Sequence, residues 1–242
     1  MHILSIVFYL IGLGLNERGI SLHGKKILKN CKKIYLENYT ITFPYTKKEL
    51  EKQLKIKVIE ADREFIENEK IIDESEKQDV ALLIYGSPLS ATTHISLINK
   101  AIKNKVNYKI IYSASIFNAI AESGLQLYKF GKTASLPKYQ KNFAPESFIE
   151  TIKNNQKINA HTLLLIDIGL KFEDARQQLN QTNYELFKSE KIIVCSQLGY
   201  KTKIFCNHLD KIDESKIKMP YCIIIPSNIS HSEEEALKLV LR

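Results

Sequence analysis

The stretch "DVALLIYGSPLSATTH", residues 79–94, decides the fold class of this chain. Every residue from 80 to 85 is apolar or aromatic, which is typical of a strand buried on both faces of a parallel sheet. A glycine and a run of small, hydroxyl-bearing residues follow, and they predict a loop. The segment 92–105 then has the periodicity of an amphipathic helix, with Thr92 or Thr93 as its N-cap. The stretch therefore predicts the strand–loop–helix unit of an α/β protein.

The same alternation extends over the rest of the first half. We expect further strands at 6–14, 33–38, 56–62 and 108–113, separated by helices at 20–33, 46–54 and 63–75. Strands that alternate with helices at this spacing predict a mostly parallel sheet covered by helices.

The second half has a different character. Two prolines in residues 135–147 predict a connector, and helical or strand patterns follow it. We expect helices at 115–123, 148–156 and 233–242, strands at 161–168 and 221–226, and a hairpin whose strands are 191–197 and 201–207. These elements predict two domains, an N-terminal α/β domain at 1–113 and a C-terminal mixed α+β domain at 114–242.

Composition limits the class of protein. Hydrophobic residues make up 44% and charged residues 26%, which is an ordinary globular mixture. The net charge of +8 is compatible with an acidic partner such as RNA. However, the lysines are spread between residues 25 and 238 and no arginine cluster concentrates them, which favours a solvated surface over direct nucleic-acid binding.

Cysteine spacing and the N-terminus indicate the compartment. The four cysteines have no CxxC spacing and the six histidines form no HxxxH pair, so no metal site is expected. Reduced thiols in a cytoplasmic protein are the simpler interpretation. The apolar run from Ile3 to Leu15 has no basic region before it and is too short to cross a bilayer, so we expect a buried first strand and no membrane association.

Three loops follow predicted strands and are candidates for ligand binding, at 12–16, 86–94 and 113–119. In open α/β sheets, ligands bind beyond the carboxyl ends of the strands. Gly12 and Gly14 allow a close approach of the backbone to a ligand, although a structural turn explains them equally well. The spacing is not GxGxxG, and the chain has no GxSxG or P-loop motif.

The two histidines in this part of the pattern are interpreted as structural. His94 lies at the start of the helix that follows residues 86–94, and His161 opens a predicted strand. Taken from residue chemistry alone, the sequence predicts a two-domain α/β protein with a polar cleft at its strand ends.

Eight ordered motifs carry a more specific resemblance. The series "FYLIGLGL", "IYLENYT", "ADRE", "GSPLSATTH", "SASIFNA", "GLQLYKFGKT", "PESFIETIKNNQ" and "HTLLLIDI" resembles the diphthine synthases, within the tetrapyrrole-methylase-like class of S-adenosylmethionine-dependent methyltransferases. The resemblance runs from about Tyr9 to Asp167 and thins from Gly169 onward. The segment after "LIDI" is shorter than the insertion that the family usually has.

The resemblance implies a fold and an activity. The fold is the two-domain tetrapyrrole-methylase-like one, with S-adenosyl-L-methionine in the cleft between the domains. The reaction is methylation of the amino group of a modified histidine on translation elongation factor 2, by a cytoplasmic homodimer. The stretch "GLQLYKFG" would lie near the domain junction as a short extended segment between turns at Gly124 and Gly131; an ordinary edge strand is the alternative.

The resemblance also implies the cofactor site. Its positions are Leu15, Ser87, Ser90, Ser115, Ile116, Ile166, Leu198 and Cys222. The family usually has Asp where this chain has Ser87, and His where it has Cys222. No catalytic residue is assigned, because the donor sulfonium is already activated and the protein need only align the reactants and exclude water. The two departures leave open the alternative of an inactive family member that binds elongation factor 2.

Overall fold

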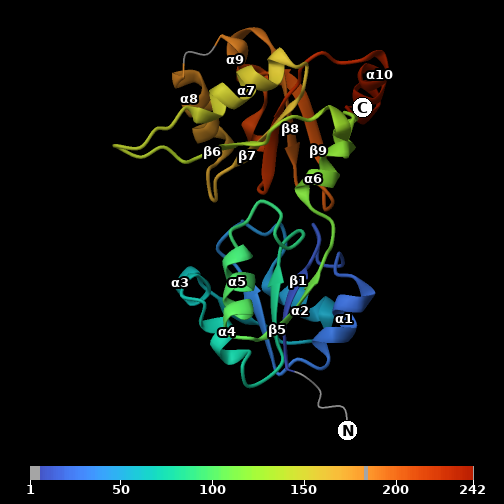
Figure 1. The fold of residues 1–242 in the computed structure, drawn as a ribbon. Helices are drawn as coiled ribbons and strands as arrows, with labels where there is room; N and C mark the ends of the chain where they lie inside the picture. Colours follow the sequence, from blue (N-terminus) through green and yellow to red (C-terminus); the bar gives the residue numbers. More distant parts are fainter. Residues whose placement is uncertain (1–5, 183–184, 242) are drawn as a thin grey trace. The chain divides into compact units, whose positions relative to one another are not determined.

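The computed structural model describes residues 6–182 and 185–241. The chain forms two compact units, Met1–Phe117 and Asn118–Arg242 (Figure 1). The sequence placed a division near residue 113. The start of the apolar run noted from Ile3 to Leu15, residues 3–5, and the end of the predicted last helix at residue 242 lie outside the described residues.

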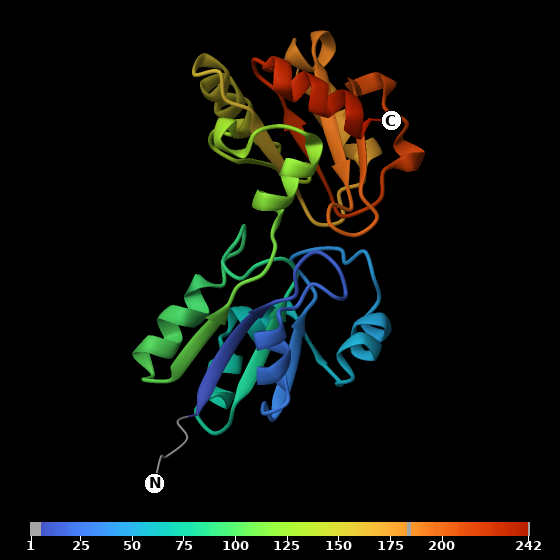
Figure 2. The same ribbon diagram turned by 90° about the vertical axis from the view of Figure 1, so that its right-hand side faces the viewer.

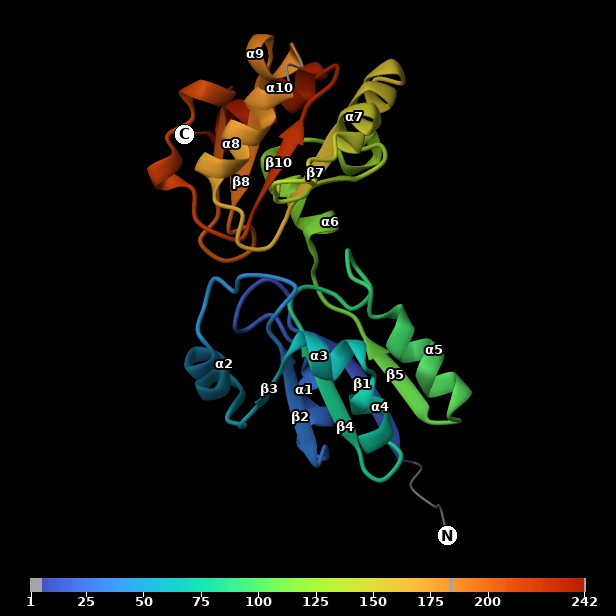
Figure 3. The same ribbon diagram turned by 90° about the vertical axis from the view of Figure 1, so that its left-hand side faces the viewer.

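The N-terminal unit contains a parallel sheet with the strand order β3-β2-β4-β1-β5 (Figure 3). Its strands are β1 (Val7–Gly12), β2 (Lys33–Glu37), β3 (Ile59–Ala61), β4 (Val80–Ile84) and β5 (Asn107–Ile111). Every neighbouring pair is parallel, and β4 is buried along its whole length. The fold class predicted from "DVALLIYG" is confirmed.

Helices cover both faces of this sheet (Figure 1). They are α1 (Leu22–Leu28), α2 (Lys47–Leu54), α3 (Arg63–Glu67), α4 (Lys70–Glu74) and α5 (Ile95–Lys103). Apolar side chains of α3, α4 and α5, among them Ile66, Ile72 and Leu97, pack in one buried cluster with Leu10 and Leu82 of the sheet. This cluster holds α5 against β4, the strand that precedes the loop 86–94.

Three predicted helices in this unit have wrong boundaries, and the first, expected at 20–33, spans only Leu22–Leu28. The helix expected at 63–75 is divided into α3 and α4, because Glu69 has a φ of +57° and breaks the helical run. Helix α5 begins at Ile95 with His94 as its N-cap, instead of Thr92 or Thr93, and His94 makes no side-chain cap. The hydroxyl of Thr92 accepts the backbone N–H of His94 at 3.1 Å and so supports the residue before the helix.

The C-terminal unit contains a mixed sheet with the order β6-β7-β10-β8-β9. Its strands are β6 (Ala134–Leu136), β7 (Thr162–Ile166), β8 (Lys191–Ser196), β9 (Lys203–His208) and β10 (Tyr221–Ile225). The β6–β7 pair is parallel and the other pairs are antiparallel. The predicted mixed α+β domain and its hairpin, β8 with β9, are confirmed.

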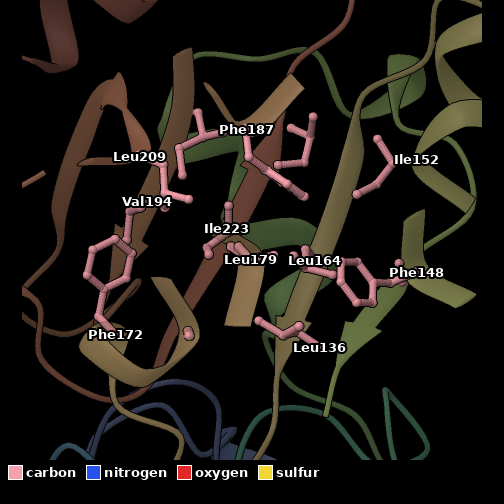
Figure 4. Packing of buried hydrophobic residues seen from close by; sticks show 14 of the residues in the cluster. Leu136, Phe148, Ile152, Leu164, Phe172, Leu179, Phe187, Val194, Leu209 and Ile223 are labelled. Atoms are coloured by element: carbon pink, nitrogen blue, oxygen red, sulfur yellow. The ribbon is translucent and has the colours of Figure 1, made fainter. Parts of the chain in front are cut away.

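Helices pack on this second sheet around a large apolar core (Figure 4). Helices α7 (Ser147–Lys157), α8 (Phe172–Gln181) and α9 (Leu186–Ser189) contribute buried residues to this core. The unit also contains α10 (His231–Val240), and α6 (Ile116–Ala119), which has no buried residue, spans the division between Phe117 and Asn118. Phe148, Leu164, Leu179 and Ile223 are among the buried residues of the cluster. Helices α8 and α9 and the short strand β6 were not predicted. Among the described residues, no helix is long and apolar enough to cross a membrane.

The segment "GLQLYKFG" belongs to the C-terminal unit and is not a short extended strand. Residues Leu127–Lys129 form one turn of 3₁₀ helix, and a similar turn, Ile120–Ser123, precedes it. Gly124 has a φ of +85° and ends that first turn, as predicted for a turn residue. Gly131 has no positive φ; a Cβ there would collide with the side chain of Asn155.

A buried carboxylate explains why this segment folds back on itself. Glu233, near the start of α10, is buried and accepts the backbone N–H of Gln126 at 3.0 Å and a bond from the Lys129 ammonium. It also contacts His161 Nε2 at 3.1 Å and accepts the backbone N–H of Ser230 at 2.8 Å. Figure 2 shows α10, in red, within the C-terminal unit. These residues form the Glu233 network, which ties the segment to α10 and β7.

Candidate cofactor site

The candidate site of the N-terminal unit starts from three loops at one edge of its sheet. Strands β4 and β5 flank β1 and run parallel to it, so the loops after Gly12, Ile84 and Ile111 leave the same edge. This placement confirms that the segments around 12–16, 86–94 and 113–119 leave the sheet side by side.

Glycines let the first two loops touch. Gly14 and Gly86 form a bridge through Gly14 N to Gly86 O at 3.0 Å and Gly86 N to Gly14 O at 2.9 Å. Both have a positive φ, of +68° and +79°. A Cβ on Gly12 would lie 2.7 Å from Gly86 O. The close approach at Gly12 and Gly14 is therefore to the protein's own loops, which explains both glycines without a ligand.

Ser113 joins the third loop to the other two. Its backbone N–H donates to Ser87 Oγ at 3.3 Å, and its hydroxyl donates to Gly19 O at 2.8 Å. Tyr85, the last side chain of the β4 apolar run, donates its hydroxyl to Leu15 O at 3.0 Å. The three loops thus form one hydrogen-bonded rim around the strand ends.

The structure brings the N-terminal set of predicted residues onto this rim. Leu15, Ser87 and Ser115 are buried, whereas Ser90 and Ile116 are half-buried. A Cβ on Gly86 would have Ala114 O at 3.9 Å and Ser115 Cα at 4.0 Å as its nearest neighbours, which is ordinary van der Waals contact. The Gly86 backbone therefore lies against the third loop without a clash, between the positions of Ser87 and Ser115.

The other predicted residues lie together at one end of the second sheet. Ile166 ends β7, and Cys222 on β10 is paired with Leu165 of β7 and with Cys195 of β8. Leu198 follows β8 in a tight turn in which Gln197 has a φ of +53°. The C-terminal unit therefore places Ile166, Leu198 and Cys222 at neighbouring strand ends.

Cys222 is part of a buried thiol pair. It faces Cys195 across β8 and β10, and both side chains are at most 2% exposed. A hydrogen bond with Cys222, together with burial, raises the pKa of the Cys195 thiol well above its ordinary value. The Cys195 thiol therefore stays protonated, and the buried pair supplies apolar surface at this strand end.

The electrostatics of the predicted set are neutral throughout. Its members offer hydroxyls, a thiol, backbone groups and apolar side chains. Across residues 6–182 and 185–241, no group of three or more His, Cys, Asp or Glu is placed to hold a metal ion. Such a set suits an uncharged part of a ligand, such as an adenine ring or a ribose, better than it suits a metal or a phosphate.

Sequence reasoning missed three residues that shape the rim. Tyr85, Ser113 and Gly19 hold the loops in place through their hydrogen bonds. For Tyr85 the sequence contains a signal, because a phenol hydroxyl at the end of an apolar strand needs a hydrogen-bond partner. Ser113 and Gly19 had none, because their partners lie up to 94 residues away in sequence.

The two histidines differ from each other. His161 is fully buried with both ring nitrogens bonded, since Nδ1 accepts the backbone N–H of Ser227 at 2.9 Å and Nε2 contacts Glu233. Burial lowers its pKa, and the Glu233 carboxylate partly opposes that shift. The structural interpretation of His161 is confirmed. His94 is 1% exposed, and its Nε2 has no hydrogen-bond partner among the described residues.

Known proteins share this arrangement. A diphthine methyl ester synthase of Schizosaccharomyces pombe is 45% identical over 168 residues, which are 68% of this chain and 59% of that protein. A crystallised diphthine synthase has a TM-score of 0.88 and 27% identity over 97% of this chain and 95% of its own. A crystallised protein of Entamoeba histolytica has a TM-score of 0.86 and 29% identity over 98% of both chains.

Two sheets with loops gathered at their strand ends define the two-domain α/β class to which the diphthine synthase structures belong. Within that class, the chain belongs to the tetrapyrrole (corrin/porphyrin) methylase family, whose model matches residues 7–213. The resemblance to diphthine synthases is confirmed by the relatives. The chain spans about three fifths of the length of the S. pombe relative.

Proposed function

We propose that this protein is an S-adenosylmethionine-dependent methyltransferase of diphthamide synthesis. It methylates the amino group of the modified histidine on translation elongation factor 2. The observation that carries the proposal is the 45% identity to a diphthine methyl ester synthase, joined with a strand-end rim that has a Gly14–Gly86 bridge and the buried hydroxyls of Ser87 and Ser115. The relative's name denotes an ester product, so the acceptor of this chain would include a carboxylate oxygen in addition to the amine.

The residues of both units fit the donor. Leu15, Ser87, Ser90, Ser115 and Ile116 of the first unit, and Ile166, Leu198 and Cys222 of the second, would contact it. Half-buried Ile116 and Ile166 and buried Leu198 supply apolar walls for adenine, and the buried hydroxyls of Ser87 and Ser115 supply hydrogen bonds.

The bound donor supplies an activated methyl group on a sulfonium. What the protein contributes is alignment of the acceptor lone pair with the methyl carbon and sulfur, and exclusion of water. Hydrogen bonds among Ser87, Ser113 and Gly19 keep the rim preorganised for this task. A strong base is unnecessary when the amine enters deprotonated.

Calorimetry with S-adenosylhomocysteine tests the cofactor assignment, and binding at micromolar ligand is expected. Methyl transfer to elongation factor 2 that carries the unmethylated intermediate tests the reaction. Absence of binding at millimolar S-adenosylhomocysteine would contradict the proposal. We further propose that the enzyme acts in the cytoplasm as a homodimer, which light scattering of the purified protein tests.

A second function is favoured by Ser87 and Cys222, which are neutral where the family usually has Asp and His. A protein with these residues could bind elongation factor 2 without transferring methyl groups. The two functions separate in one experiment, because only the enzyme transfers label from the donor to the factor. Co-purification with the factor, combined with no transfer, would support the second.

A further inference from the structure

The connection between β2 and α2 is held in place at both of its ends. At its start, the buried Glu37 carboxylate accepts the backbone N–H groups of Tyr39 and Thr40, at 3.0 Å and 2.7 Å, and the Thr40 hydroxyl, at 2.6 Å. At its end, Thr46 begins α2 with a complete capping box. Connecting segments are usually more mobile than the elements that they join. Residues 38–46, which we call the β2 loop, are instead fixed.

Aromatic rings join the middle of the β2 loop to the strand-end rim. The Phe43 ring lies edge-on to the Tyr45 ring, with centroids 5.4 Å apart, and edge-on to the Tyr85 ring, with centroids 5.3 Å apart. The centroids of Tyr45 and Tyr85 are 6.3 Å apart, so the three rings form one cluster, the aromatic trio. Edge-to-face pairs at such distances attract each other beyond the effect of their buried area. The trio therefore holds the β2 loop against the end of β4.

The topology places the β2 loop beside the three loops that form the rim. Strand β2 is the neighbour of β4 in the sheet and runs parallel to it. The carboxyl ends of β2, β4, β1 and β5 therefore lie at the same edge, where ligands bind in open α/β sheets. Tyr85, directly after β4, is the member of the trio that belongs to the rim.

Tyr85 connects the trio to a predicted donor-binding residue. Its hydroxyl donates to Leu15 O at 3.0 Å, and burial raises the pKa of the phenol, so the hydroxyl remains a donor. The turn that follows Leu15 is closed by Gly19 N, which donates to Asn16 O at 3.1 Å. At the far end of this turn, the Ser113 hydroxyl donates to Gly19 O at 2.8 Å. Side chains from the ends of β4 and β5 thus hold the turn on both sides.

We infer that the β2 loop is a fourth loop of the rim and that Tyr85 is a positioning residue, which transmits the restraint of Phe43 and Tyr45 to the Leu15 carbonyl. The trio thereby sets the position of the turn at 15–19 against the donor. This role rests on the proposed function, since that function assigns Leu15 to S-adenosylmethionine. Tyr85 acts through Leu15 and has no part in the chemical step.

The first test measures the Leu15 carbonyl without any cofactor. Carbon-13 at the leucine carbonyls and nitrogen-15 at asparagine select the Leu–Asn pairs of the sequence, Leu15–Asn16 and Leu179–Asn180. The second pair lies in the other unit and is the internal reference. Tyr85→Phe keeps the ring but removes the donated bond, so it should shift the Leu15 carbonyl signal. Phe43→Leu should shift the same signal in the same direction.

Tyr35→Phe is the matched control for the loss of a hydroxyl. The Tyr35 hydroxyl donates to Glu74 Oε2 at 2.7 Å, away from the rim. Removal of this bond should lower the urea midpoint as Tyr85→Phe does, but should leave the Leu15 signal in place. A Leu15 signal that does not respond to Tyr85→Phe, or that responds equally to Tyr35→Phe, would overturn the inference.

The second test measures the consequence for the donor. Tyr85→Phe should weaken S-adenosylhomocysteine binding about fivefold, and Phe43→Leu about threefold, because each loosens the Leu15 carbonyl. In methyl transfer, the KM for the donor should rise while kcat stays near its wild-type value. In the Tyr85→Phe protein, Phe43→Leu should cause little further loss, because it acts through the missing hydroxyl. Additive losses would overturn the transmission through Tyr85.

Phe65→Leu separates positioning from a general loss of stability. The Phe65 ring lies 4.9 Å from the Tyr35 ring, outside the rim. This variant should unfold at lower urea but bind S-adenosylhomocysteine like wild type, and an affinity loss equal to that of Phe43→Leu would overturn the inference. If wild type does not bind S-adenosylhomocysteine, the proposed function is wrong, whereas the Leu15 carbonyl signal still decides whether Tyr85 positions the turn.

Discussion

The two buried histidines mark a difference between the units. His161 belongs to the Glu233 network, where both of its nitrogens have partners and an ammonium balances the carboxylate. His94 lies beside a rim of neutral hydroxyls and backbone groups, with one nitrogen unpartnered among the described residues. A fully bonded network stabilises the fold, whereas an incompletely bonded one at a strand end is typical of a region that works on something else. The "GLQLYKFG" segment thus belongs to the fully bonded network, whereas the "ATTH" stretch carries the histidine beside the rim.

Removal of the central carboxylate should give the largest effect. Glu233→Ala leaves Lys129 and two backbone N–H groups without their acceptor, so we expect a loss of about 3 kcal/mol in the free energy of unfolding. Urea unfolding measures it. The control is Glu234→Ala, whose partner Lys238 lies on the same exposed helix face. Equal midpoints for the two variants would mean that the Glu233 network does not stabilise its unit.

A substitution at Gly124 tests how tightly α10, the helix that carries Glu233, packs against the backbone of the "GLQLYKFG" segment. Gly124→Ala places a Cβ 2.9 Å from Leu237 N of α10, at a φ of +85°. The matched control is Gly169→Ala, which has a φ of +70° and open space around its Cβ. We expect a cost of about 1 kcal/mol at Gly169 and about 2–3 kcal/mol at Gly124. Similar melting temperatures for the two variants would show that α10 is not held tightly against the segment.

The substitution Ser87→Asp tests the neutral character of the rim by adding a negative charge to it. A carboxylate can still accept the Ser113 N–H, and it adds a charge that favours a sulfonium. We expect S-adenosylmethionine to bind about tenfold more tightly, as judged by calorimetry, with Ser87→Asn as the neutral control of similar volume. Unchanged or weaker binding in a folded Ser87→Asp protein would show that the loop departs from the family's geometry.

The pH dependence of stability should show the smallest effect. The pKa values of His161 and Glu233 are both lowered in the folded protein, the first by burial and the second by its bonds to Lys129, Ser230, Gln126 and His161, which outweigh burial. Both groups therefore bind protons more strongly when unfolded. Their contribution is complete above about pH 6.5, the unfolded value of histidine, and decreases as the pH falls.

The urea midpoint should accordingly decrease as the pH falls from roughly 6.5 to 5, and again below about pH 4.3 as Glu233 is protonated in the unfolded chain. The His161→Asn variant should lose less than wild type over the first interval. An identical slope would mean that another group titrates there, and His94, whose pKa is also lowered by burial, is the first to examine.

The elements that could be predicted are those with a local signal. The β4 segment is apolar throughout, so it cannot be a strand with one face in solvent. The β8–β9 hairpin could be predicted because the turn between its two strands is recognisable in the sequence. Helix α8 was missed although Phe172, Ala175 and Leu179 are all buried, because Gln and Asn between them obscured the apolar periodicity. The strand β6 has three residues, too few for any period to appear.

Long-range partners explain the remaining errors. The residues from 124 to 131 give no sign that Lys129 bonds a carboxylate 104 residues later in the chain. Without that bond, the alternation of apolar and polar residues predicts an extended segment. For the same reason, the strand-end loops could be predicted as a group, but the links from Ser113 and Tyr85 could not. The positive φ of Glu69, which divides α3 from α4, likewise has no signal in a residue type that favours helices.

The position of β1 has a consequence for the order in which the chain can fold. This strand lies between β4 and β5, and its residue Val7 pairs with Asn107 while Phe8 pairs with Val80. During synthesis the first strand thus leaves the ribosome long before either of its neighbours exists. Until then its apolar side chains, including Phe8, Leu10 and Ile11, have no sheet to enter. The interior strand β1 is thus the one that waits longest for its partners, and the nascent chain is the state most in need of a chaperone.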